Sequence, residues 1–242
     1  MAITVLTACT AFVNQYDLTS YATDLEADVE VDDVDSTTFG SSGWREYQSG
    51  LKKTEAKLST FLDTATGGTE PVANALLAAN GTVLSCSETG VQGSPAVILR
   101  GFFDHQDLFG KVGEMAKVGL TFRGAKNEGL LHGNLVAAKQ TQTASGNVTG
   151  TQMSAFGSTG KLWSALHVFS ASGTTPSLTA LVKSSSTLGG AYTTRITHTA
   201  ATAAGSELVS LAGPLTDTFY RVDWTISGTT PSFSFAVVVG IA

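Results

Sequence analysis

An alternation of acidic and apolar residues near the N-terminus most constrains how this chain can fold. Five carboxylates occupy every second position of one stretch, and apolar residues fill the positions between them. The acidic residues are Asp24, Glu26, Asp28, Glu30 and Asp32, and the apolar ones are Leu25, Ala27, Val29 and Val31. A period of two is the period of a β-strand, so the stretch predicts a strand with one acidic face and one apolar face.

The residues that follow predict that this strand belongs to a long hairpin. After Asp35 the composition changes to Ser, Thr and Gly, with Phe39 and Trp44 embedded, and a second alternating segment covers residues 51–62. A return strand of this kind would form a hairpin with a polar tip that carries two aromatic side chains. Lys53 and Lys57 would neutralise part of the acidic face if they share its side, which the pattern leaves open.

The acidic face carries an electrostatic cost. Neighbouring carboxylates on one strand face lie about 6.8 Å apart and repel by about 0.6 kcal/mol in water, so four such pairs cost about 2.4 kcal/mol at most. One interpretation is an ordinary exposed strand, although a face that is merely solvated would normally have lysines between its acidic residues. In the other, the negative field itself is functional, because a polyanion must pass without binding.

Composition and length predict a mainly β protein of one large or two modest domains. Of 242 residues, 42% are hydrophobic and 14% charged, and 26 are glycine, which is typical of packed strands and tight turns. We expect a β-sandwich or barrel with one short helix, then an Ig-like or jelly-roll-like β-sandwich. The helix should cover residues 70–79, with Thr69 as its N-cap and Asn80 and Gly81 at its end. Strands of the first part should include residues 3–13, 82–87, 96–103, 116–123 and 130–138. Residues 141–151 have a linker composition, which places the domains at residues 1–150 and 151–242.

A repeated motif supports the second sandwich. The sequence SGTTPS occurs at residues 172–177 and again at residues 227–232, and alternating segments flank both copies. The repetition predicts that one turn is used twice, in two equivalent hairpins.

The charge distribution argues against a nucleic-acid-gripping surface. Residues 1–131 hold 17 acidic and 9 basic residues, whereas residues 132–242 hold 3 and 5, so the acidic half lacks the basic patch that phosphate contacts require. Cys9 and Cys86 match neither a metal spacing nor a disulfide framework, which predicts free thiols. No apolar run approaches the length of a membrane span, and we expect no membrane insertion.

The sequence contains no pattern that predicts catalysis, a cofactor or a metal. The four histidines lack a zinc-binding spacing. They are His105, His132, His167 and His198. An EF-hand loop that begins at Asp28 would place Asp33 and Phe39 where Gly and Glu are required. Phosphate-binding, nucleophile-elbow and dinucleotide motifs are also missing. We therefore predict that the protein is not an enzyme.

Several segments resemble, in order, the major tail tube proteins of siphophages, which have long non-contractile tails. The segments are NQYDLTSY (14–21), TTFGSSGWREYQSGL (37–51), GKVGEMAKVGLTFRG (110–124), GLLHGNLV (129–136), GKLWSALHVFSASGTTPSL (160–178) and the final stretch from residue 213. Each motif is short, and their order and spacing over nearly the whole chain carry the resemblance. The C-terminal sandwich would be an added module.

The resemblance implies a structural subunit of the virion tail, assembled in the host cytoplasm. Such subunits form stacked rings, commonly hexamers, around a lumen that conducts the genome during ejection. It implies that Asp24, Glu26, Asp28, Glu30 and Asp32 line the lumen and that the tip contacts the next ring. The tip residues are Phe39, Gly40, Gly43, Trp44 and Arg45.

The implied partners are other copies of the chain, the tape measure protein, the tail terminator, the distal tail proteins and transiting DNA, which is not specifically bound. The C-terminal module would decorate the outside. The alternative function is a virion decoration or carbohydrate-binding protein.

Overall fold

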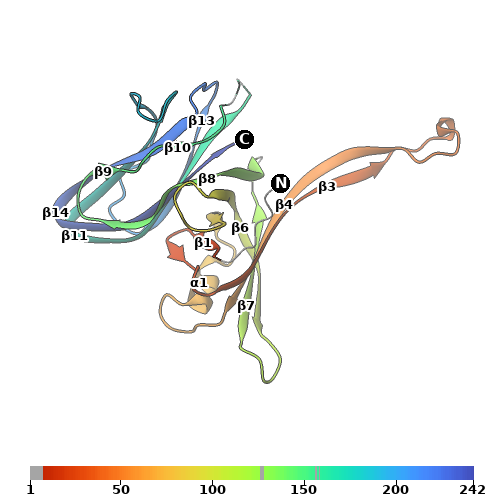
Figure 1. The fold of residues 1–242 in the computed structure, drawn as a ribbon. Helices are drawn as coiled ribbons and strands as arrows, with labels where there is room; N and C mark the ends of the chain where they lie inside the picture. Colours follow the sequence, from red (N-terminus) through yellow and green to blue (C-terminus); the bar gives the residue numbers. More distant parts are fainter. Residues whose placement is uncertain (1–7, 126–127, 156, 158) are drawn as a thin grey trace.

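The protein is mainly β-structure, as the composition predicts, with 63% of the residues that the structure describes in strands and 5% in helices. The computed structural model describes residues 8–125, 128–155, 157 and 159–242. The named strands pair in antiparallel fashion within one sheet, whose main path runs β12-β11-β14-β8-β6-β5-β1-β2. Figure 1 shows a curved body from which a two-stranded arm, β3 and β4, projects on its own.

Elements of the first part of the chain include β1 (Thr10–Val13), β2 (Tyr16–Asp17), β3 (Ala22–Asp35), the 3-10 helix η1 (Phe39–Ser41), β4 (Tyr47–Phe61), α1 (Thr69–Leu76), β5 (Asn80–Ser87), β6 (Pro95–Phe109), β7 (Lys117–Gly124) and β8 (Leu130–Gln142). The later part adds β9 (Gly146–Asn147), β10 (Thr151–Gln152), β11 (Lys161–Ser185), β12 (Thr193–Thr197), β13 (Gly205–Ala212) and β14 (Phe219–Ile241).

The predicted strands of the first part lie close to their expected positions. β5, β6, β7 and β8 cover the stretches expected at residues 82–87, 96–103, 116–123 and 130–138, and β6 and β8 continue several residues further. The first strand, predicted over residues 3–13, is described from Thr10 onward, and residues 1–7 lie outside the described residues.

The helix α1 is shorter than predicted, and its first residue has a different role. The sequence predicts residues 70–79 with Thr69 as the N-cap, but the helix already includes Thr69 and has no side-chain cap. The Thr69 hydroxyl instead donates to the carbonyl of Phe61 at 2.7 Å, which ties the helix to the end of β4. Asn80, expected to stop the helix, begins β5. Val72 and Leu76 are buried, so the helix packs onto the core that β4 and β7 also cover.

The later part of the chain is organised around one hairpin, β11 and β14, which pair over almost their whole length. This hairpin folds back on itself. The Oγ of Ser164, early in β11, lies 2.8 Å from Nε2 of His198, whose backbone N–H donates to the carbonyl of Ala180, late in β11. Sixteen residues of straight strand would separate these positions by about 53 Å, so the two parts of the hairpin face each other as layers of a sandwich.

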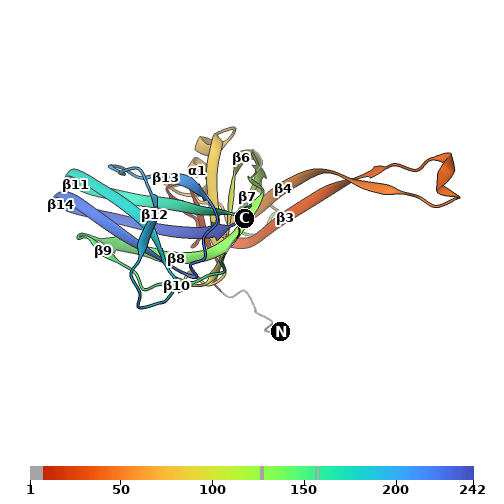
Figure 2. The same cartoon turned by 90° about the horizontal axis from the view of Figure 1, so that it is seen from above.

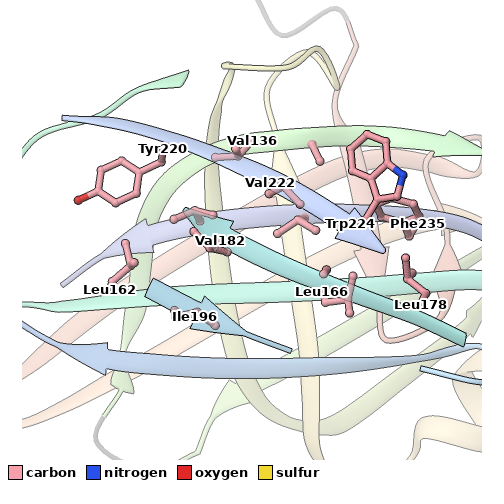
Figure 3. Close-up of a cluster of buried hydrophobic side chains, with 14 of the residues drawn as sticks. Val136, Leu162, Leu166, Leu178, Val182, Ile196, Tyr220, Val222, Trp224 and Phe235 are labelled. Atoms are coloured by element: carbon pink, nitrogen blue, oxygen red, sulfur yellow. The ribbon is translucent and has the colours of Figure 1, made fainter. Parts of the chain in front are cut away.

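Other strands extend each layer. β13 and β8 flank the layer formed by the start of β11 and the end of β14, and β12, β9 and β10 flank the other layer. Figures 1 and 2 show the long strands curving together through this region. Figure 3 shows the core between the layers, to which Leu162 and Val182 from the two parts of β11 and Val222 and Phe235 from β14 all contribute.

The SGTTPS motif forms the corner of this folded hairpin, so the prediction of two equivalent hairpins is wrong. The two copies lie opposite each other in one ladder, with Ser172 paired to Ser232 and Ser177 paired to Ser227. Gly173 has a φ of 115°, and an added Cβ would lie 2.8 Å from the carbonyl oxygen of Thr230. The second copy repeats this geometry at its own glycine, because each strand of the corner makes the same bend against the other.

The sheet continues across the predicted boundary at residue 150. β8 pairs directly with β14, and one buried cluster joins Phe12, Ile98 and Leu131 from the first part to Trp163 and Val238 from the later part. Two short strands of the predicted linker, β9 and β10, also pair with β14. The division into domains 1–150 and 151–242 stays a prediction.

Candidate functional site

The candidate functional site is the outer face of a four-stranded part of the sheet, in the order β3-β4-β7-β6. The first three strands pair β3 with β4 and β4 with β7, and β6 completes the set. Within the described residues, β3 pairs only with β4, and residues 104–109 of β6 pair only with β7. Both edges of this four-stranded unit therefore present unpaired backbone groups.

The acidic residues of β3 lie on one face, opposite the lysines of β4. Glu26 is directly paired with Lys57, and Glu30 with Lys53, while Asp28 faces Glu55. Residues opposite each other in an antiparallel ladder point to the same side of the sheet. The question that the sequence leaves open is thus answered: both lysines share the acidic face.

A network of ion pairs connects the charges of this face. Lys53 Nζ lies 3.1 Å from a carboxylate oxygen of Glu30, and Lys57 Nζ lies 3.7 Å from Glu26 and 3.4 Å from Glu55. The hydrogen bond and the charge of Glu30 raise the pKa of the exposed Lys53 ammonium. Most of these side chains are about half exposed, so each pair contributes little to stability. The network mainly orients the charges.

The polar face continues onto β7 and β6. Glu55 also contacts Arg123, at 3.7 Å, and Arg123 forms an ion pair with Asp104. His105 and Asp107 on β6 are joined at 2.9 Å. In all, seven carboxylates and four lysine or arginine cations share the face; they are Asp24, Glu26, Asp28, Glu30, Glu55, Asp104 and Asp107, with Lys53, Lys57, Lys117 and Arg123. The net charge of the face is −3 with neutral His105.

The opposite face of the same strands is apolar. Near the body it forms part of the core, where Leu58, Leu120 and Phe122 are buried. Towards the tip it is uncovered, and the exposed fractions of Val29 and Val31 are 48% and 45%. The hairpin therefore carries an acidic face and an apolar face from Asp24 to Val31, as the alternation predicts.

The tip is a locally hydrogen-bonded turn. Thr38 Oγ1 accepts a hydrogen bond from the backbone N–H of Gly40 at 3.2 Å, and Gly43 adopts a φ of 86° that favours glycine. Phe39 and Trp44 are fully or largely exposed, at 112% and 79%. Both residues lie in the connection between β3 and β4, and this connection is the far end of the projecting arm (Figure 1).

The predicted site residues fall into two groups. Four of the five acidic residues, Asp24 to Glu30, share the polar face, whereas Asp32 lies at a β-bulge beside Gly50, where the register shifts. The tip residues, including Arg45, whose guanidinium donates to the Tyr47 hydroxyl at 3.3 Å, cluster at the other end of the hairpin. Their roles as lumen-lining and ring-stacking residues stay predictions.

Sequence reasoning missed the contributions of β6 and β7. Asp104, Asp107 and Arg123 lie far from the acidic strand in the sequence, and only the strand pairing brings them onto the face that carries Glu55. The alternation of Lys117, Gly119, Thr121 and Arg123 with apolar residues is the signal that could have indicated the face of β7.

Two buried histidines link parts of the fold. His167 is fully buried, and its Nδ1 donates to the carbonyl of Asn14 at 2.7 Å, so its Nε2 accepts from the Ser85 hydroxyl at 2.8 Å. Burial lowers the pKa of His167 to about 4. These contacts join β11 to the first part of the chain.

His198 contacts Ser164 at 2.8 Å and Glu207 at 2.9 Å. This chain of groups resembles a catalytic triad in order, but Ser164 has no exposed surface that a substrate could reach. Burial lowers the pKa of His198. The described residues hold no group of three or more side chains placed to bind a metal ion. In the same part of the chain, no helix has the length and apolarity to cross a membrane.

Comparisons with known proteins give distant similarities only. No protein-family model and no curated protein matches the chain. The virion of a native gene transfer agent particle contains a similar chain, with 13% identity over 53% of this chain and 98% of that one, at a TM-score of 0.41. A chain of the tail of an empty gene transfer agent particle, refined with C6 symmetry, shows 16% identity over 49% and 91%, at 0.37.

A third similar structure is the Dit protein of SPP1, titled as a hub adsorption apparatus of phages that infect Gram-positive bacteria. It shows 14% identity over 98% of this chain and 100% of that chain, at a TM-score of 0.39. These three structures belong to gene transfer agent particles and to a phage. With TM-scores below 0.5, the similarities carry no assignment of family or function.

Proposed function

We propose that this chain is a structural subunit of a phage tail tube, which polymerises as stacked rings around a lumen that conducts the genome. The observation that supports this proposal is the unit β3-β4-β7-β6, with two unpaired edges and one continuous polar face. Unpaired edges are sites at which a further strand can add, and closure into a barrel removes them.

The strand directions suit closure by rotational symmetry. Successive strands of the unit run antiparallel, so β6 at one edge runs opposite to β3 at the other. When copies are related by rotation about a ring axis, residues 104–109 of one copy meet β3 of the next as antiparallel strands. The ring can therefore close into one antiparallel barrel with the same junction repeated.

The polar face would line the lumen. The other face carries Leu58, Leu120 and Phe122, which belong to the core of the subunit and cannot face water. The ring then multiplies a charge of −3 by the number of copies and repels DNA phosphates from all sides, so the genome passes without adhesion. By the family resemblance, the partners would be the tape measure protein inside the tube and the terminator and distal tail proteins at its ends.

Electron microscopy of the purified protein tests this proposal, with proline variants that block the edge of β6. Consecutive residues of a strand point their N–H groups to opposite sides. One of the two variants Gln106→Pro and Asp107→Pro therefore removes a hydrogen bond to β7, and the other, the edge variant, alters only the unpaired edge of β6. We expect tubes from the parent protein and folded monomers from the edge variant. Tubes formed by both the parent protein and the folded edge variant would refute the proposal. A parent protein that stays monomeric and binds glycans would also refute it.

A further inference from the structure

A second hairpin tip lies at the opposite end of the four-stranded unit from the tip of the arm. The strand pairing places Ala22 of β3 on one row with Leu108 of β6, through one residue each of β4 and β7. From this row the arm continues in one direction to Asp35, over about 43 Å of extended strand. The β6–β7 hairpin continues in the other direction into its own tip, residues 110–116. Figure 1 shows the two hairpins projecting from the body in different directions.

The β6–β7 tip carries two exposed apolar side chains. The exposed fractions of Val112 and Met115 are 107% and 67%. Of the large apolar side chains in the described residues, Phe39 and Val112 are the two most exposed, and they lie at opposite ends of the unit. The backbone N–H of Glu114 donates to the carbonyl of Lys111 at 3.1 Å, so the tip is a closed turn that holds these side chains in solvent. Apolar groups gathered in this way mark a contact site.

The two tips are complementary in their chemistry. The tip of the arm offers two aromatic rings, and the β6–β7 tip offers a branched aliphatic side chain and a thioether, which packs favourably against aromatic rings. Each tip also carries one exposed cation and one exposed anion, which are Arg45 and Glu46 on the arm and Lys111 and Glu114 on the β6–β7 tip. A contact between the tips can therefore cover both apolar pairs while each charge meets an opposite charge.

We propose that the tip of the arm of one copy docks on the β6–β7 tip of a copy in the adjacent ring, so that its two aromatic side chains pack against Val112 and Met115. This inference rests on the proposed function, because stacked rings bring opposite ends of the unit together. The two contacting surfaces differ, so the contact is head-to-tail and repeats without closing, as the growth of a tube requires. Ring closure uses other surfaces, the unpaired edges of β3 and β6.

Electron microscopy of Val112→Asp/Met115→Asp separates stacking from ring closure. The variant leaves both strand edges intact, so we expect single rings and the loss of tubes. The matched control Val91→Asp/Leu188→Asp adds the same charge at two other exposed apolar residues and should form tubes like the parent.

Tubes from Val112→Asp/Met115→Asp, or an equal loss of tubes in the control, would overturn the docking of the tips and leave the proposed function standing. Monomers in place of rings would also overturn it, because the β6–β7 tip would then be needed for ring closure. A parent protein that forms neither rings nor tubes would overturn both proposals.

Cross-linking within assembled tubes tests the contact directly. In a Cys9→Ala/Cys86→Ala background, Trp44→Cys is combined with Met115→Cys, and the matched control combines Trp44→Cys with Leu188→Cys. The two thiols of the first protein lie at opposite ends of the unit, so a disulfide between them must join different copies. Mild oxidation should link many subunits of the first protein into long covalent chains and give the control dimers at most. The absence of such chains, or equal chains in both proteins, would overturn the proposal.

Discussion

His167 should make the protein sensitive to mild acid. Its imidazole is fully buried between Asn14 and Ser85, and burial lowers its pKa from 6.5 to about 4. The His167 imidazole therefore binds a proton below about pH 6.5 in the unfolded chain but only below about pH 4 in the folded protein. A folded-state pKa lower than that of the unfolded state makes stability fall as the pH drops through 6.5, and the loss levels off below pH 4.

The size of this effect follows from the two pKa values. The full shift corresponds to about 3 kcal/mol of unfolding free energy, and about 2 kcal/mol of it should be lost between pH 7.5 and pH 5.0. This is a large share of a typical stability of about 5–15 kcal/mol. His198, whose pKa burial also lowers, adds a loss of the same sign that also begins as the pH falls through 6.5.

Urea unfolding at pH 7.5 and pH 5.0, followed by tryptophan fluorescence, measures this loss. In His167→Gln the amide can still donate to the Asn14 carbonyl and accept from Ser85, but it does not titrate. We expect its unfolding free energy to depend less on pH than that of the parent, by about 2 kcal/mol. The control His105→Gln changes an exposed side chain and should behave like the parent. An equal pH dependence in the parent and His167→Gln would refute the reasoning.

Four further predictions follow from the hairpins and the corner. Changing the four acids Asp24, Glu26, Asp28 and Glu30 to Lys should cost the monomer about 1 kcal/mol of stability or less. Assembled tubes of this variant should nevertheless retain DNA at low salt, and unchanged DNA binding would show that the acidic face does not line the lumen. Gly173→Ala should destabilise the protein by about 1–3 kcal/mol in thermal unfolding, because it combines a positive φ with a backbone clash, whereas Gly189→Ala, in open space, should be nearly neutral. Hydrogen exchange around Trp44 should be fast in the monomer and slow in tubes; equal rates would argue against a stacking role for the tip. A chain that ends at residue 150 loses the β14 partner of β8 and should be poorly soluble, and a stable fragment would instead support the predicted domain division.

The sequence allowed the local features of the candidate site to be predicted but not its extent. The alternation from Asp24 to Glu30 predicts one acidic face because side-chain direction in a strand depends only on position. The break at Asp32 could not be predicted, because a bulge depends on how the partner strand turns at Gly50. The addition of Asp104 and Arg123 depends on pairing between distant strands, which a single sequence does not specify.

In the later part of the fold, too, the sequence predicts local structure but not topology. The apolar alternation around Trp163 and Trp224 predicts strands, and the structure contains them. The SGTTPS repeat was assigned to two hairpin turns because Gly and Pro are typical of turns. Instead, both copies bend within strands that already pair with each other, so the local backbone irregularity was predicted correctly and its topological role was not.

The position of β14 has a consequence for biosynthesis. This strand is made after the other described strands, yet it lies between β8 and β11 in the interior of the sheet. Pairing with β8 joins residues about a hundred positions apart, and contacts of such separation form late because the loop-closure entropy must be lost first. During translation the edge of β8 stays open until β14 has been synthesised. Completion of the sheet therefore waits for the synthesis of β14, and a translation product that stops before β14 cannot form the intact sheet.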